Sequence, residues 1–155
     1  MRILWYNITM IIIVILYHSK GDSCMLGINY WAVVVAAVAA FVASSVWYIV
    51  FGKELAKASP AFAEGLQKRQ PWKMLVVIVQ SLVLALVLAY FIGLIGNVDW
   101  IGAVRVGVLL WIGLSAVQWV GSMLWEKVPL KMAAIHAGDW LVKLVLIAVI
   151  VGVWR

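Results

Sequence analysis

Residues 125–144 read WEKVPLKMAAIHAGDWLVKL, a charged loop that passes directly into an apolar segment carrying His136, Asp139 and Lys143. These three ionisable groups are spaced so that they share one face of an α-helix. With a rise of about 1.5 Å per residue, Asp139 would lie about 8 Å and Lys143 about 14 Å inside a helix that begins near residue 134. An unpaired charge at such a depth in hydrocarbon is costly. The stretch therefore predicts a membrane-spanning helix with a polar site.

The rest of the chain is far more apolar than a soluble domain. Of its 155 residues, 67% are hydrophobic and 12% are charged, and the mean hydropathy is +1.12. Soluble domains are about half apolar and about a quarter charged. The three prolines fall between the long apolar runs, where no helix is interrupted. The composition indicates an integral membrane protein.

Four apolar runs are long enough to cross a bilayer, which takes about 20 helical residues. They predict an all-α fold, a polytopic transmembrane helical bundle within residues 25–155, with spans at about 28–51, 74–95, 101–125 and 134–154.

Residues 1–24 form an N-terminal extension with a shorter apolar run at 3–17. Two interpretations stay open. The run is either an uncleaved anchor, which adds a short apolar helix to the bundle, or the product of a start codon placed upstream of Met25.

Basic residues concentrate in two of the connecting segments. Residues 52–73 hold five lysines and arginines, residues 126–133 hold two, and the turn at 96–99 holds none. Because basic loops stay on the cytoplasmic side, both segments are predicted to be cytoplasmic. The net charge of +6 then faces anionic lipid headgroups, above all near residues 52–73. Lipid is thus the expected partner, and nucleic acid is not.

The first span carries a stripe of small residues. They recur every fourth position, at Ala32, Ala36, Ala40 and Ser44. Such a stripe lets another helix approach closely. We interpret it as a helix-packing face, with a pore lining as the alternative.

Two polar residues stand out in the third span. Arg105 lies about one turn inside its outer end, so we expect it to extend toward the headgroups, near Asp99. Gln118 shares a face with two serines, from which it can hydrogen-bond to Asp139 or Lys143, or to Gln80 and Ser81 of the second span. Together with His136, these residues are the candidate intramembrane polar site.

Segments 28–42 (INYWAVVVAAVAAFV), 45–53 (SVWYIVFGK) and 125–144 together resemble the bacterial domain-of-unknown-function family 1761. The resemblance covers residues 28–154. It implies a small four-helix integral membrane protein that starts close to Asn29. The family carries no established activity, so the resemblance supports the architecture and adds no mechanism.

Catalytic signatures are absent from the sequence. It has no G-x-S-x-G, no H-E-x-x-H and no phosphate loop. Cys24 is the only cysteine, so neither an internal disulfide nor a cysteine-only metal site can form. We therefore expect no enzyme, no metal and no cofactor.

Three hypotheses remain for the function of a protein in the bacterial cytoplasmic (inner) membrane, and the weakest of them is a membrane enzyme, for which only His136 and Asp139 could do acid–base work. We favour a structural or accessory membrane subunit, in which Asp139 and Lys143 neutralise each other and His136 sits at the cytoplasmic boundary. The alternative is a small transporter or an ion- or proton-conducting module that uses the Asp139–Lys143 pair. Because four helices enclose little space, this alternative implies a homo-oligomer.

Overall fold

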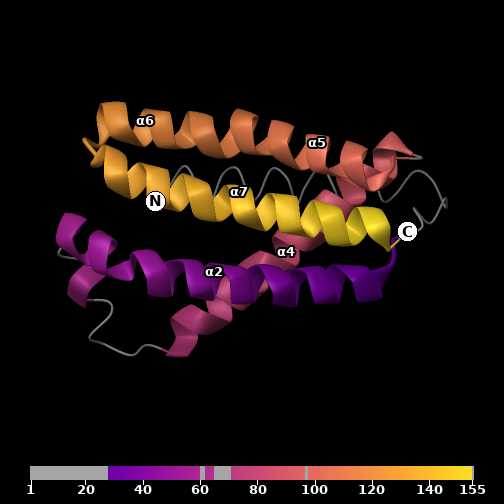
Figure 1. The fold of residues 1–155 in the computed structure, drawn as a ribbon, viewed down its shortest axis with the longest axis horizontal. Coiled ribbons are helices and arrows are strands. Elements are labelled where there is room, and N and C mark those ends of the chain that lie inside the picture. Colours follow the sequence, from indigo (N-terminus) through magenta and orange to yellow (C-terminus); the bar gives the residue numbers. More distant parts are fainter. Residues whose placement is uncertain (1–27, 60–61, 65–70, 97, 155) are drawn as a thin grey trace.

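The computed structural model describes residues 28–59, 62–64, 71–96 and 98–154, and within these the chain is helical with no strand (Figure 1). The helices are α2 (Tyr30–Ala58), α4 (Pro71–Ile95), α5 (Trp100–Leu110), the π-helical segment η1 (Trp111–Ala116), α6 (Val117–Trp125) and α7 (Leu130–Val153). The segments α5, η1 and α6 follow one another as a single long helix. Counted in this way, four helices of the described residues are long and apolar enough to cross a membrane. The predicted helical bundle is confirmed, while the extension at 1–24 with its run at 3–17 lies outside the described residues.

Helix α7 lies in the middle of the bundle. It packs against α2 on one side and against the α5–η1–α6 helix on the other, while α4 crosses obliquely behind them and packs mainly on α2 (Figure 1). The helix with the predicted polar site thus contacts every other helix.

The start of α2 is fixed by Asn29. Its side-chain oxygen accepts hydrogen bonds from the backbone N–H groups of Trp31 (3.1 Å) and Ala32 (3.3 Å), which lack partners inside the helix. Its side-chain amide donates to the carbonyl oxygen of Trp154, at the end of α7 (3.1 Å). The first described helix is therefore tied to the end of the last one.

The third span starts with a similar cap. The Asp99 carboxylate accepts a hydrogen bond from the backbone N–H of Gly102 (2.9 Å). Before it, Gly96 takes a φ of +91°, a left-handed conformation that glycine adopts without strain. These features produce the turn that the sequence predicts between α4 and α5.

The helices extend further than the apolar runs that predicted them. Helix α2 continues to Ala58 rather than ending near 51, and α7 begins at Leu130 rather than near 134. The added turns carry charged side chains that pair with one another: Glu54 pairs with Lys57 at 3.0 Å and also with Lys131 of α7. Hydropathy thus underestimates helix length, because charged residues continue a helix where they can reach water.

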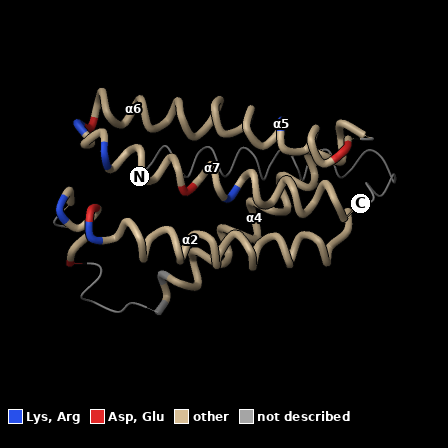
Figure 2. The backbone as a smooth tube through the Cα atoms, in the orientation of Figure 1, with Lys and Arg blue, Asp and Glu red and all other residues tan. Residues whose placement is uncertain are grey.

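The longer α7 changes the depth of its polar residues. Counted from Leu130 at about 1.5 Å per residue, Asp139 lies about 14 Å and Lys143 about 20 Å along the helix, near its middle. By contrast, many of the described charged residues gather where α2 ends and α7 begins (Figure 2). Asp139 and Lys143 are therefore set apart from that charged end.

Small residues allow close helix packing in the core. Ala36 and Ala40 are 0% exposed and Ser44 is 3% exposed, which confirms the small-residue stripe as a packing face. Between α5 and α7, a Cβ atom at Gly107 would lie 3.1 Å from the Leu144 carbonyl oxygen. The central helix is thus held tightly on both sides.

Candidate functional site

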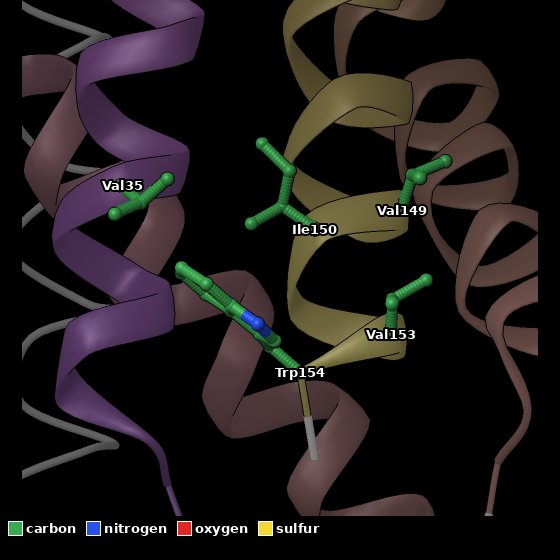
Figure 3. Close-up of a pocket in the computed structure, with 5 residues that line it drawn as sticks. All are labelled: Val35, Val149, Ile150, Val153 and Trp154. Carbon is green, nitrogen blue, oxygen red and sulfur yellow. The ribbon is translucent and has the colours of Figure 1, made fainter.

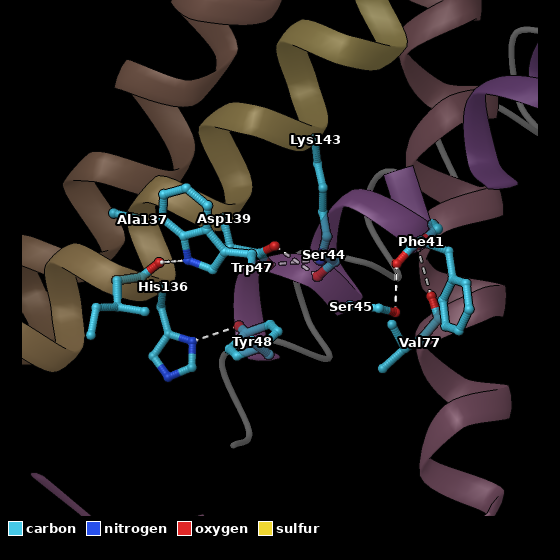
Figure 4. A network of polar contacts seen from close by, with 12 residues as sticks. Phe41, Ser44, Ser45, Trp47, Tyr48, Val77, His136, Ala137, Asp139 and Lys143 are labelled. Carbon is cyan, nitrogen blue, oxygen red and sulfur yellow. Dashed lines mark hydrogen bonds and ion pairs between the residues drawn. The ribbon is translucent and has the colours of Figure 1, made fainter. Parts of the chain in front are cut away.

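The candidate site is a polar cluster between α2 and α7 (Figure 4). Asp139 is 2% exposed, and its Oδ2 lies 2.8 Å from the Lys143 ammonium nitrogen. Its Oδ1 accepts a hydrogen bond of 2.7 Å from the Ser44 hydroxyl of α2. The predicted pairing of Asp139 with Lys143 is confirmed, and Ser44 adds a partner that the sequence analysis did not identify.

This arrangement compensates two charges inside the bundle. A buried carboxylate or ammonium is costly unless it is paired and hydrogen-bonded. Both oxygens of Asp139 are engaged, and the Lys143 nitrogen also lies 5.9 Å from the centre of the Trp140 ring. Among the described residues, no buried side-chain nitrogen or oxygen lacks a hydrogen-bond partner. The pair is therefore neutral as a unit and faces a packed helix.

His136 lies one turn closer to the start of α7. Its Nδ1 is 2.8 Å from the Tyr48 hydroxyl of α2, which donates to the ring when this nitrogen is unprotonated. On its other side the imidazole stacks on Trp119 of α6, with ring centres 5.0 Å apart and planes 5° from parallel. His136 is thus held between α2 and α6, rather than standing free at the membrane boundary.

Two tryptophans hold the backbone of α7 from opposite sides. The Trp47 indole of α2 donates to the carbonyl oxygen of Ile135 at 3.0 Å, and the Trp111 indole of η1 donates to that of Ala137 at 2.7 Å. A carbonyl oxygen has two lone pairs, so it can accept an indole N–H in addition to its helical hydrogen bond. These contacts hold α7 against α2 and against η1 within the same turn of α7.

Gly138 completes this region. A Cβ atom there would lie 2.7 Å from Cζ2 of Trp47, so a side chain would displace the indole. All five residues from 135 to 139, which we call the IHAGD segment, thus have a defined contact with a neighbouring helix. The candidate site is a junction at which α2, α7 and the third span meet.

A family model described as "Protein of unknown function (DUF1761)" matches residues 31–152. The chain belongs to this family. The match includes α4 to α6, the IHAGD segment and Ser44, and nearly all of α2 and α7. No curated protein and no solved structure matches the chain. Because the family description assigns no activity, the function of this DUF1761 protein has to be argued from its own geometry.

Two predicted members of the site lie elsewhere in this DUF1761 protein. Gln118 is exposed on α6 and makes no hydrogen bond to Asp139 or Lys143, because those groups bond to each other and to Ser44. Arg105 is exposed on α5, and its reach toward the headgroups stays a prediction.

The partners of the IHAGD segment carried a weak signal in the sequence. Ser44 is a hydroxyl at the end of an otherwise alanine stripe, which marks it as a hydrogen-bond donor on a packing face. Trp47 gave no such signal, because tryptophan near a membrane boundary is expected to lie in the headgroup region. Trp111 lies near the middle of the third span, where a buried indole N–H usually has a hydrogen-bond partner, but the sequence does not say which one. Only the register between helices places their indoles on α7.

A separate apolar groove lies near the other end of α2 and α7. It has a volume of about 270 Å³ and is lined by Val35, Val149, Ile150, Val153 and Trp154 (Figure 3). No ionisable side chain lines it. The residues that line it therefore offer no acid or base for chemistry in this DUF1761 protein.

Proposed function

We propose that this DUF1761 protein is a structural or accessory subunit of the bacterial cytoplasmic membrane and is not an enzyme. The observation that carries the proposal is the state of Asp139. Its two carboxylate oxygens are bonded to Ser44 and Lys143, and the carboxylate is 2% exposed. Asp139 therefore joins α7 to α2 through Ser44, while Lys143 neutralises its charge within α7.

The hydrogen bond from Ser44 to the buried Asp139 selects one alignment of α2 with α7. If α2 slid along α7 by one turn, about 5.4 Å, Ser44 would leave Asp139 and Trp47 would leave Gly138. The carboxylate would then lose a hydrogen bond in an environment where water cannot replace it. The polar contacts thus contribute specificity of pairing, whereas the apolar core contributes most of the packing energy.

The distribution of charge supports an orientation for the bundle. Residues 52–73 and 126–133 carry seven of the twelve lysines and arginines, so both segments face the cytoplasm and anionic headgroups in our proposal. An accessory role fits this orientation, because the exposed Lys53 and Lys127 are available to lipid.

Paired substitutions of the buried charges test the structural role. Lys143→Leu leaves the Asp139 carboxylate without its counter-ion, and we expect it to lower the free energy of unfolding by about 3–5 kcal/mol. The double variant Asp139→Leu/Lys143→Leu removes both charges, and we expect it to be as stable as the wild type or more stable. Unfolding in detergent micelles measures both. A double variant as unstable as the single one would contradict the proposal.

The alternative, a proton-conducting module, is favoured by one observation. The Tyr48–His136 contact and the Ser44–Asp139–Lys143 contacts follow one another along the first half of α7. The buried residues beyond Lys143 are apolar, namely Leu144, Ile147, Ala148 and Val151. A relay would therefore need a second polar route past this apolar half.

Proton flux in proteoliposomes separates the two functions. We expect no flux that depends on Asp139. If the wild type conducts protons and an equally stable Asp139→Asn variant does not, the relay is right and the structural proposal is wrong.

A further inference from the structure

Helix α6 is the least covered part of the bundle. None of its residues is buried, although it packs on α7 through Trp119. Its open side includes Val117, which is 63% exposed, and the amide of Gln118, which is exposed and has no hydrogen-bond partner among the described residues. A primary amide without a partner is costly in hydrocarbon.

Gln118 lies too deep in the membrane for its side-chain amide to reach water easily. The continuous helix Trp100–Trp125 has 26 residues. It is about 39 Å long, and the hydrocarbon core is about 30 Å thick, so each end projects about 4–5 Å when the helix is centred. Gln118 lies seven residues before Trp125, about 10 Å along the helix, and therefore about 6 Å inside the core.

Side-chain direction distinguishes Gln118 from the exposed Gln80 of α4. Side chains of a helix point toward its N-terminus. For Gln80 the nearer membrane boundary lies at the N-terminal end of α4, near Trp72, so its amide points toward headgroups. For Gln118 the nearer boundary lies at the C-terminal end of α6, near Trp125, so its amide points toward the membrane centre. Gln118 thus needs a protein partner where Gln80 does not.

We propose that the α6 face around Gln118 binds a second copy of this chain across a two-fold axis along the membrane normal, with the two Gln118 amides hydrogen-bonded to each other. Every copy inserted in the same orientation carries this amide at the same depth. The amide has both donors and an acceptor, so it is complementary to itself, as a two-fold contact requires.

Two glycines of the third span support a second copy of the chain as the partner of this face. Cβ atoms built at Gly113 and Gly121 meet nothing within 4 Å, so the bundle leaves space beside both glycines. Small residues of this kind let two membrane helices approach closely enough for a side-chain hydrogen bond between them. The proposed contact concerns the side of the third span that faces away from the IHAGD segment, and it goes beyond the role proposed for Asp139.

Cross-linking tests the position of the contact. In the full chain with Cys24→Ala, reconstituted in liposomes, Gly121→Cys is expected to form a disulfide-linked dimer under mild oxidation. Val79→Cys, on the exposed face of α4 next to Gln80, is the matched control and is expected to remain monomeric. Absence of a Gly121→Cys dimer, or equal cross-linking of the two variants, overturns the proposal.

A second measurement tests the role of the amide. Energy transfer between labelled copies in liposomes gives the dimer dissociation constant. We expect Gln118→Leu to raise it about tenfold, as for the loss of one hydrogen bond between membrane helices, and Gln80→Leu to leave it unchanged. Neither side chain contacts another described residue through a hydrogen bond, so unfolding of both variants should match the wild type. A monomeric wild type, or a Gln118→Leu dimer of wild-type affinity, overturns the proposal.

Discussion

Gly138→Ala should destabilise the bundle, although alanine is the better helix former. In an open helix position this substitution gains up to about 1 kcal/mol. At Gly138 the added Cβ atom would lie 2.7 Å from Cζ2 and 3.1 Å from Cη2 of Trp47. Carbon atoms prefer about 3.5–4.0 Å, so the indole has to move by about 1 Å. That movement stretches its 3.0 Å hydrogen bond to the Ile135 carbonyl oxygen beyond bonding distance.

The expected loss combines two effects. A lost hydrogen bond costs about 0.5–1.5 kcal/mol, and overpacking a tight contact costs about 1–3 kcal/mol. After subtracting a gain in helix propensity of about 1 kcal/mol, we expect the free energy of unfolding to fall by about 0.5–3.5 kcal/mol.

Equilibrium unfolding in detergent micelles, followed by circular dichroism, measures the loss. Gly52→Ala is the matched control, because a Cβ atom at this position of α2 meets nothing within 4 Å and is not part of the proposed dimer contact, and its stability should be unchanged or up to about 1 kcal/mol higher. Equal gains for the two variants would show that Trp47 is not held against Gly138.

The same unfolding assay checks two further contacts. Ser44→Ala removes a hydrogen-bond donor from the buried Asp139 carboxylate and should cost about 1–3 kcal/mol, whereas Ser45→Ala, whose hydroxyl bonds only within its own helix, should cost less. Equal losses would mean that Ser44 contributes nothing specific to Asp139. Tyr48→Phe removes the hydroxyl that contacts His136 and should cost about 0.5–1.5 kcal/mol; an unchanged stability would exclude a contribution from this hydrogen bond.

The sequence predicted what depends on residues near one another in the chain. The four spans follow from the length of their apolar runs, and the Asp139–Lys143 pair follows from its spacing of four residues on one helix. The burial of Ala36 and Ala40 follows in the same way from their spacing of four. Each of these inferences needs only the geometry of a single helix.

What the sequence could not predict depends on the register between distant helices. Ser44 and Asp139 are 95 positions apart, and nothing in either span states which residues face each other. The face shared by Ser115 and Gln118 in the sequence is not shared in the structure, where Ser115 is buried and Gln118 is exposed, for a related reason. The π-helical segment η1 changes the angle between successive residues just before α6, so a face counted with the ordinary helical period does not carry through it.

The hydrogen bond between Asn29 and the Trp154 carbonyl oxygen has a consequence for the order in which the helices are connected. It brings the start of α2 next to the end of α7, so the two ends of the described bundle lie side by side. A short linker from residue 154 to residue 29 could join these ends, with new termini opened at the exposed Glu126 between α6 and α7. In such a circular permutant α7 would enter the membrane before α2 and every helix would keep its direction. The contacts of the IHAGD segment with α2 would then join neighbouring parts of the chain, whereas those with Trp111 and Trp119 would join distant ones.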